Sequence, residues 1–257
     1  MTPVNSDASH QLQLLAPEGL QAQISTWLQQ DAQRRHALQV CRAVLTSLNI
    51  SDWYIAAGFV RNLVWDKLHH IALQPLNDID VIYWCDTDVS VARDRAIEAE
   101  LRRQVDLPWS VKNQARMHLN NNDPAYLSCL DAMSYWPEMQ TAVGVKLVNM
   151  SVGTISTDRV NGTVDNTANL QLNNNVATDA KLNSNIALTS SSTFCVLSYG
   201  DEIKVDAVFG LIRLFSLCLN ANPKCDISVF KSRIVQKKWL SRYPKLTLVS
   251  DPFLLSQ

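Results

Sequence analysis

Two carboxylates stand one residue apart at Asp78 and Asp80, at the start of the apolar stretch 79–84. The stretch predicts a β-strand, in which successive side chains alternate between faces, so the two acids point the same way while Ile79 and Val81 point into a core. Two carboxylates on one face repel each other, and Mg²⁺ relieves that repulsion because it favours carboxylate oxygens together with substrate phosphates. The spacing therefore predicts a magnesium site for phosphoryl-transfer chemistry, against the alternative of a solvated strand end.

A turn of small residues lies upstream of these acids. Residues 53–57 are apolar and predict a short strand, and Gly58 opens a helix with buried positions at 60, 63, 64 and 68. Such a turn lets the backbone approach a phosphate, which then faces the N-terminus of the helix. Arg61, one turn into this helix, is either a phosphate ligand or a tie between the helix and an acidic loop.

A second group of polar side chains follows in residues 112–118. If the strand expected over 109–112 continues, Lys112 and Gln114 share a face; if the segment is helical, Lys112, Asn113 and Arg116 share one. Either geometry presents donors to a triphosphate or a base. The alternative is a buried network that fixes this segment against the sheet.

The elements that must position these residues alternate between helix and strand. The pattern predicts an α/β (α+β) fold: a small mixed sheet with flanking helices, N-terminal helices and a C-terminal helical pair. Helices are expected over 17–28, 36–48, 58–68, 91–104, 113–119, 127–136, 209–219 and 228–240, and strands over 53–57, 78–84, 109–112, 141–148, 194–197 and 203–207.

Domain organisation follows from composition. Residues 1–16 are expected to form a flexible tail, and residues 17–257 a single domain. Residues 151–192 interrupt that domain, because more than half of them are Asn, Ser, Thr or Asp and none is aromatic. So few large apolar groups do not offset the entropy of ordering, which predicts an inserted excursion.

Bulk properties restrict the partners and the location. The net charge of −1 gives no strong signal for nucleic acid, and Arg233, Lys237 and Lys238 are expected on a solvated helix face. No apolar run reaches the ~18 residues of a membrane span, so no membrane partner is expected. Six scattered cysteines without a Cys-x-x-Cys pair, and no secretory signal, favour a reducing, cytoplasmic setting.

The turn and the acids together resemble the core of the DNA-polymerase-β-like nucleotidyltransferase superfamily. Ala57-Gly58-Phe59-Val60-Arg61-Asn62 is similar to the Gly-Gly-x-Val-Arg-Asp segment of its poly(A)-polymerase and tRNA-nucleotidyltransferase branch. A closer resemblance covers roughly residues 50–150 and 200–248. It is to a bacterial nucleotidyltransferase-like family whose hallmark is Val-Lys-Asn-Gln-Ala-Arg-Met-His, here residues 111–118.

The resemblance implies metal-dependent transfer of a nucleoside monophosphate from a nucleoside triphosphate to an acceptor that the sequence does not name. Asp78 and Asp80 would bind Mg²⁺, and Asp206 is the candidate third acid, with Asp131 and Glu138 as alternatives. The residues expected to bind the nucleotide are Ala57, Gly58, Arg61, Asn62, Lys112, Asn113 and Arg116.

A non-catalytic nucleotide-binding or protein-interaction module on the same fold is the rival hypothesis. The relatives carry Gly-Leu-Asp-Asp-Leu-Phe near the C-terminus, whereas this chain has Ile212 and Arg213 in place of the two acids. The third acid is also unassigned by any motif. Both observations favour a member that kept the fold and lost turnover.

Overall fold

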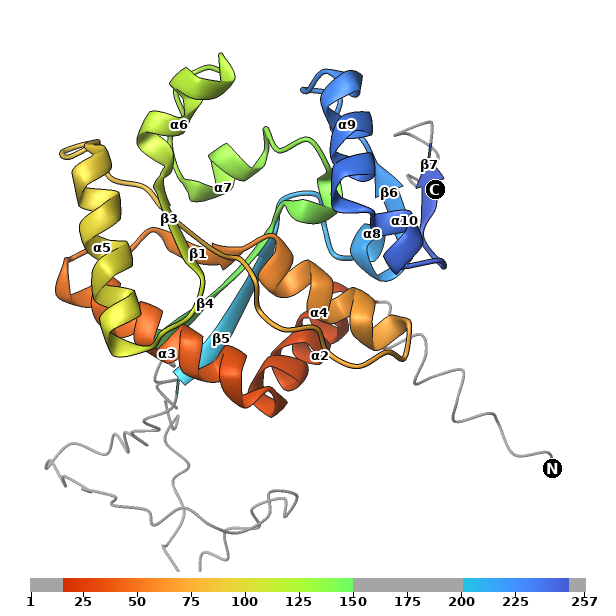
Figure 1. Cartoon of the computed structure of the whole chain (residues 1–257), viewed down its shortest axis with the longest axis horizontal. Coiled ribbons are helices and arrows are strands. Elements are labelled where there is room, and N and C mark those ends of the chain that lie inside the picture. The colour runs from red at the N-terminus through yellow and green to blue at the C-terminus, as the bar shows by residue number, and fades with distance from the viewer. Residues whose placement is uncertain (1–15, 150–200, 250–257) are drawn as a thin grey trace, which may run out of the picture. The chain divides into compact units, whose positions relative to one another are not determined.

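The computed structural model describes residues 16–149 and 201–249 (Figure 1). The chain divides into two compact units, residues 1–147 with 203–257 and residues 148–202. The described part of the second unit is limited to two strand ends, 148–149 and 201–202, so the architecture below is that of the first. The expected tail 1–16, apart from residue 16, the insertion 151–192 and the strand 194–197 lie outside the described residues.

A five-stranded mixed sheet with the order β3-β2-β1-β4-β5 forms the centre. β1 pairs antiparallel with both β2 and β4, whereas β2 and β3 run parallel. In this register Asp80 of β2 lies opposite Ala56 of β1 and Ser110 of β3. The strands are β1 (Trp53–Ala56), β2 (Ile79–Tyr83), β3 (Trp109–Asn113), β4 (Val143–Asn149) and β5 (Asp201–Ala207).

Four helices pack against one face of the sheet and enclose the larger core. Apolar side chains at alternate strand positions, such as Ile55, Val81 and Val111, are fully buried against them. The spacing of Leu20, Ile24 and Leu28 shows why the first helix forms, since it places all three on one buried stripe. The helices are α2 (Pro17–Gln30), α3 (Ala32–Ser47), α4 (Gly58–Leu68) and α5 (Val91–Gln104).

The opposite face of the sheet is only partly covered. A smaller cluster forms where Tyr54 and Ile82 of the sheet meet Cys129 and Met133 of α7 (Cys129–Met133). α6 (Gln114–Asn121) precedes α7, and the short η1 (Met139–Thr141) leads into β4. Asp80 alternates with buried Ile79 and Val81 and therefore belongs to this less covered face.

The C-terminal part adds short helices and a second, two-stranded sheet. α9 (Ile227–Lys237) and α10 (Trp239–Arg242) are separated by Lys238, whose φ of 51° ends the first helix. The helix expected over 209–219 is wrong for most of its length, because only α8 (Ile212–Phe215) is helical. Leu217 has a φ of 58°, and the next residues form β6 (Cys218–Asn220), which pairs parallel with β7 (Thr247–Val249).

The fold class expected from the sequence is confirmed: a mixed sheet, flanking helices, two helices at the N-terminal side and helices at the C-terminal side. Several boundaries also differ, two of which matter most for the site and its surroundings. β2 begins at Ile79, so Asp78 comes just before the strand, and the helix expected over 127–136 is only α7. No helix within the described ranges is both long and apolar enough to cross a membrane.

Candidate active site

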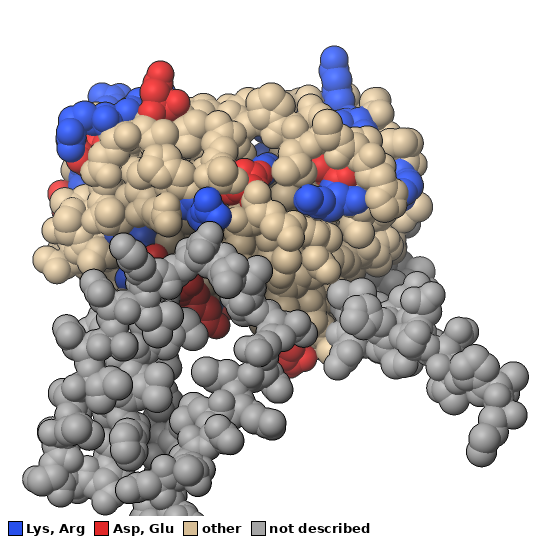
Figure 2. Space-filling model, turned by 90° about the horizontal axis from the view of Figure 1, so that it is seen from below, with Lys and Arg blue, Asp and Glu red and all other residues tan. Residues whose placement is uncertain are grey.

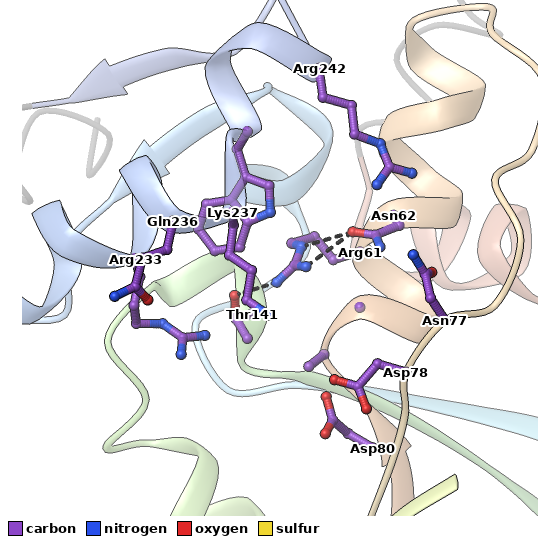
Figure 3. Close-up of a pocket in the computed structure, with 13 residues that line it drawn as sticks. Arg61, Asn62, Asn77, Asp78, Asp80, Thr141, Arg233, Gln236, Lys237 and Arg242 are labelled. Atoms are coloured by element: carbon purple, nitrogen blue, oxygen red, sulfur yellow. Dashed lines mark hydrogen bonds between the residues drawn. The ribbon is translucent and has the colours of Figure 1, made fainter. Parts of the chain in front are cut away.

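A pocket of about 470 Å³ lies where β1 ends and β2 begins, beside α9 and α10 (Figure 3). The first half of the chain supplies the turn before α4, the loop before β2 and both acids. The second half supplies three basic side chains and an indole. The lining residues are Ala57, Gly58, Arg61, Asn62, Asn77, Asp78, Asp80, Thr141, Arg233, Gln236, Lys237, Trp239 and Arg242.

Asp78 and Asp80 both line this pocket, and their carboxylates lie close together in Figure 3. Asp78 is exposed and Asp80 is half-buried. Burial, followed by repulsion from Asp78, raises the pKa of Asp80 to about 6, against the opposing field of Arg61, Lys237 and Arg233. Two ionised carboxylates this close together repel each other, and a cation bound between them would remove that repulsion.

The turn into α4 leaves backbone donors facing the pocket. Ala57 has φ 53° and ψ −116°, a conformation that favours glycine, and no side chain caps the helix after it. Val60 N–H donates to the Ala57 carbonyl at 3.2 Å, whereas the N–H groups of Gly58 and Phe59 have no acceptor among the described residues, as expected for an anion site. Gly58 has ordinary helical φ, and a Cβ there would meet Asn62 Nδ2 at 3.4 Å, an ordinary contact.

Arg61 is buried at the wall of the pocket between two indoles. Its guanidinium carbon lies 5.2 Å from the centre of the Trp65 ring and 4.5 Å from that of Trp239. Nη1 donates to Thr141 Oγ1 at 2.8 Å, and Nη2 donates to Asn62 Oδ1 at 3.0 Å. Burial lowers the pKa of Arg61 to about 10, so the side chain stays cationic at neutral pH. Arg61 thus ties α4 to η1 and α10 and presents a fixed charge to the pocket.

The C-terminal helices bring the other cations. Arg233 and Lys237 of α9 and Arg242 of α10 line the pocket; Arg233 is half-buried and Lys237 is exposed, so the helix face expected to be solvated also borders the pocket. Arg233 and Lys237 are four residues apart and so share one face of α9. Figure 2 shows acidic and basic side chains interspersed among neutral ones on the face it views, so charge of one sign does not dominate there.

A buried acid, Asp66 of α4, holds two walls of the pocket together. It is fully buried, and its Oδ2 accepts from the backbone N–H of Gln74, in the loop that leads to Asp78. Its Oδ1 accepts from the Tyr243 hydroxyl at 2.8 Å, at the end of α10. The loop before the acids and the C-terminal helices are therefore anchored to one carboxylate.

Asp206 lies apart from the other two acids. It is on β5, three strands from β2 in the sheet order, which corresponds to roughly 14 Å at the usual strand spacing. Its carboxylate accepts from the Tyr54 hydroxyl at 2.7 Å and pairs with Lys204 at 3.2 Å. A Cβ at Gly144 would lie 2.9 Å from Tyr54 Cβ, so this glycine makes room for the tyrosine that reaches Asp206. The structure does not bring Asp206 to the pocket.

The alternatives to Asp206 are also engaged elsewhere. Asp131 accepts from the backbone N–H of Leu127 at the start of α7. Glu138 is fully buried and paired with Arg233. In the described part of the chain, no three His, Cys, Asp or Glu side chains form a group that could hold a metal ion.

The polar segment 112–116 builds a structural network instead of lining the pocket. Asn113 is fully buried and donates its amide to the carbonyls of Cys85 and Asp88. Arg116 pairs with the buried carboxylate of Asp94 at 2.5 Å. Neither of the two geometries considered for this segment forms, because β3 ends at Asn113 and α6 begins at Gln114. Lys112 is exposed on β3, outside the pocket.

Seven of the pocket residues were not predicted as site residues: Asn77, Thr141, Arg233, Gln236, Lys237, Trp239 and Arg242. Only the basic residues of α9 carried a usable signal. One stripe of α9 is polar and contains Arg233, Gln236 and Lys237. It is followed by Trp239, which is buried, so the polar stripe lies next to a packed part of the molecule.

The donor set of the pocket fits one hard cation. Two carboxylates from one strand start supply oxygen ligands, and phosphate oxygens would complete the shell that Mg²⁺ prefers. Burial, followed by repulsion from Asp78, raises the pKa of Asp80, so a cation bound between the two carboxylates would favour the ionised form of Asp80.

The fold is shared with a solved protein. An NMR structure described as revealing a CCA-adding enzyme head domain aligns with a TM-score of 0.60 and 22% identity, over 89% of this chain and 95% of that chain. No curated protein matches the chain. The chain therefore shares the fold of that domain.

The family follows from the sequence profile. A nucleotidyltransferase family matches residues 43–157 and 154–248, which together span well over half of the chain. The chain belongs to this nucleotidyltransferase family.

Proposed function

We propose that the pocket binds a nucleoside triphosphate with Mg²⁺ and that the chain transfers the nucleoside monophosphate to an acceptor. The observation that carries this proposal is the division of charge in the pocket (Figure 3). Its acids are Asp78 and Asp80, and its cations are Arg61, Arg233, Lys237 and Arg242. Four cations against two acids among the lining side chains favour a polyanion that brings its own metal ion, although the buried carboxylates of Glu138 and Asp66 lie against two of those cations.

Each part of the pocket has a distinct role in this proposal. Asp78 and Asp80 would bind Mg²⁺, which neutralises phosphate charge when bound. The N–H groups at Gly58 and the start of α4 would donate to phosphate oxygens. Arg233 and Lys237 would contact the phosphates from the opposite wall, with Arg61 as a fixed charge behind them.

The transfer itself requires positioning more than covalent chemistry. A nucleophilic oxygen of the acceptor forms a bond to the α-phosphorus, the bond from that phosphorus to the bridging oxygen breaks, and pyrophosphate leaves. The acceptor hydroxyl loses its proton to solvent. The cations of the pocket stabilise the charge that gathers on the leaving pyrophosphate.

The structure offers one specific observation for the rival, a module that binds nucleotide without turnover. Of the residues that the structure describes, two acids line the pocket, and Asp206 is held by Tyr54 and Lys204. Two carboxylates suffice to bind a magnesium–nucleotide complex. Turnover in this superfamily usually draws on a third acid, so the two functions separate at the chemical step.

Titration calorimetry with each of the four ribonucleoside triphosphates, with and without Mg²⁺, tests the binding. We expect saturable binding that requires Mg²⁺ and falls by about 100-fold in Asp80→Asn, since a metal ligand is lost. Asp86→Asn is the matched control, because Asp86 is an exposed acid outside the pocket. Equal affinity in Asp80→Asn would overturn the proposal.

Pyrophosphate release separates the enzyme from the binding module. The solved structure with the shared fold is described as a CCA-adding enzyme head domain, so a short RNA with a free 3′ hydroxyl is the first acceptor to test. Small hydroxylated molecules and protein hydroxyl groups follow. Binding without pyrophosphate release from any acceptor would support the module, and release that disappears in Asp80→Asn would support the enzyme.

A further inference from the structure

A fully buried carboxylate lies directly behind one of the pocket cations. Glu138 has a side-chain exposure of 0% and sits between α7 and η1. Its Oε1 accepts from Arg233 Nε at 2.5 Å, whereas Oε2 has no hydrogen-bond partner among the described residues. Burying a carboxylate with a bare oxygen is costly, and an apolar side chain would suit the site better for stability alone.

The contact with Glu138 leaves the two terminal nitrogens of Arg233, Nη1 and Nη2, available to a ligand. Nε is the atom engaged by Glu138, and no hydrogen bond within the described residues occupies Nη1 or Nη2. The Arg233 side chain is 34% exposed and lines the pocket. A guanidinium held by Nε keeps its two outer nitrogens as a planar fork for phosphate oxygens.

The same short segment holds the second arginine of the pocket. Thr141, three residues after Glu138, is buried and accepts from Arg61 Nη1 at 2.8 Å. Arg61 comes from α4 and Arg233 from α9. Residues 138–141 therefore contact one arginine from each of these two helices.

We propose that Glu138 is a positioning residue, which fixes the Arg233 guanidinium toward the phosphates of the bound nucleotide. This inference rests on the proposed function of the pocket. Free Arg233 has many rotamers, and holding one of them in advance removes an entropy cost from binding. Burying the charge of Glu138 lowers the stability of the fold, and the gain is a higher affinity for the nucleotide.

The test is a double-mutant cycle on the affinity for magnesium tripolyphosphate, a probe with no base or sugar. We expect Glu138→Gln, which keeps shape and removes charge, to weaken binding by about fivefold, because Arg233 loses its preferred orientation. Arg233→Gln should weaken it by about tenfold, and the double variant should bind no more weakly than Arg233→Gln alone.

Lys237 provides the matched control on the same face of α9. It lines the pocket but has no contact with Glu138 among the described residues. Glu138→Gln should therefore add its full effect to that of Lys237→Gln, while adding none to Arg233→Gln. This difference in additivity is a readout that a general loss of folding would not produce.

Thermal unfolding gives a second readout. Glu138→Gln leaves a partly exposed Arg233 that can turn to water, whereas Arg233→Gln leaves a buried charge without a partner. We expect Arg233→Gln to lower the melting temperature more than Glu138→Gln, and the double variant to recover part of the loss. Circular dichroism of each variant confirms that the titrated protein is folded.

The outcomes distinguish the two proposals. If the unmutated chain binds no magnesium tripolyphosphate, the proposed function fails and the role of Glu138 fails with it. If the unmutated chain binds it and Glu138→Gln binds equally well, or its effect adds fully to that of Arg233→Gln, only the positioning role is overturned.

Discussion

The pocket beside Asp80 and the network around Asp94 are both rich in charged side chains, yet they differ in how far those charges are satisfied. Asp94 accepts from the Tyr83 hydroxyl, from the backbone N–H of Asn113 and from Arg116. Within residues 16–149 and 201–249, no group donates a hydrogen bond to the carboxylate of Asp80, which instead faces Asp78; burial, followed by repulsion from Asp78, raises its pKa. The carboxylate of Asp94, whose hydrogen bonds are all made within the protein, stabilises the fold. The carboxylate of Asp80, which lacks such donors, is available to bind a ligand.

The largest effect should come from breaking the completed network. Asp94→Asn removes the charge that Arg116 pairs with, in a site where the acid is 4% exposed. We expect the free energy of unfolding to fall by about 3 kcal/mol, since one partner of a buried ion pair is lost. Chemical denaturation measures this, and the affinity of the folded protein for magnesium tripolyphosphate should stay unchanged.

A loss of affinity in Asp94→Asn without a loss of stability would contradict the distinction between the two regions. Glu100→Gln on the same helix is the control. That carboxylate pairs with Arg103 on the exposed surface and should contribute little to stability.

The opposite response is expected at Asp80 in metal-free protein. The pKa of Asp80 is raised to about 6 in the folded chain, so the proton binds more tightly there than in the unfolded chain. Stability from this group is complete below pH ~4 and is lost as the pH rises through 6. Asp80→Asn should therefore be more stable than the unmutated chain at pH 8 by about 1–2 kcal/mol, after allowance for solvent screening.

Denaturation of both proteins at pH 4 and pH 8 in the presence of a chelator checks this expectation. The gain should shrink toward pH 4, where Asp80 is protonated. A gain that is equal at both pH values would show that the carboxylate is not destabilised in the folded state.

Two exposed lysines compare the regions directly. Lys237 lines the pocket, whereas Lys112 lies on β3 outside it. Lys237→Gln should weaken the binding of magnesium tripolyphosphate by about fivefold, which corresponds to one partly solvated charge-assisted contact. Lys112→Gln should leave it unchanged, and an equal loss in both variants would indicate only the general field of the protein.

The smallest effect concerns the backbone of the turn. Ala57 has a φ of 53°, so Ala57→Gly should raise the free energy of unfolding by about 0.5–1 kcal/mol, once the greater entropy of unfolded glycine is subtracted. Gly58→Ala is the counterpart: it should leave stability intact and weaken phosphate binding, because its Cβ would enter the approach to α4. Denaturation and calorimetry of both variants measure the two effects.

The sheet and its main helices followed from local pattern. The sequence predicted these elements because their signals span only a few residues. The signals are the apolar alternation around Val81 and Val111 and the helical stripe of Leu20, Ile24 and Leu28. The helix expected over 209–219 does not reach its predicted end, because Cys218–Asn220 pair as a strand with Thr247–Val249, far along the chain, and this pairing overrides local preference.

The site divides in the same way. The approach of Gly58, Asp78 and Asp80 follows from a strand–turn–helix–strand order that the sequence displays. Arg233 and Lys237 reach the pocket only because α9 packs against the segment around Glu138, almost a hundred residues earlier in the chain. No local sequence pattern predicts this packing. Asn113 and Arg116 have donor-rich side chains, but whether such groups face a ligand or each other is decided only by packing.

The carboxylate of Asp66, which accepts from both Gln74 and Tyr243, has a consequence for how this end of the molecule opens. A fluctuation that frees the loop before the acids also deprives the C-terminal helices of their anchor. Amide protons of the two segments should then exchange with deuterated water as a single cooperative unit, although about 170 residues of chain separate them.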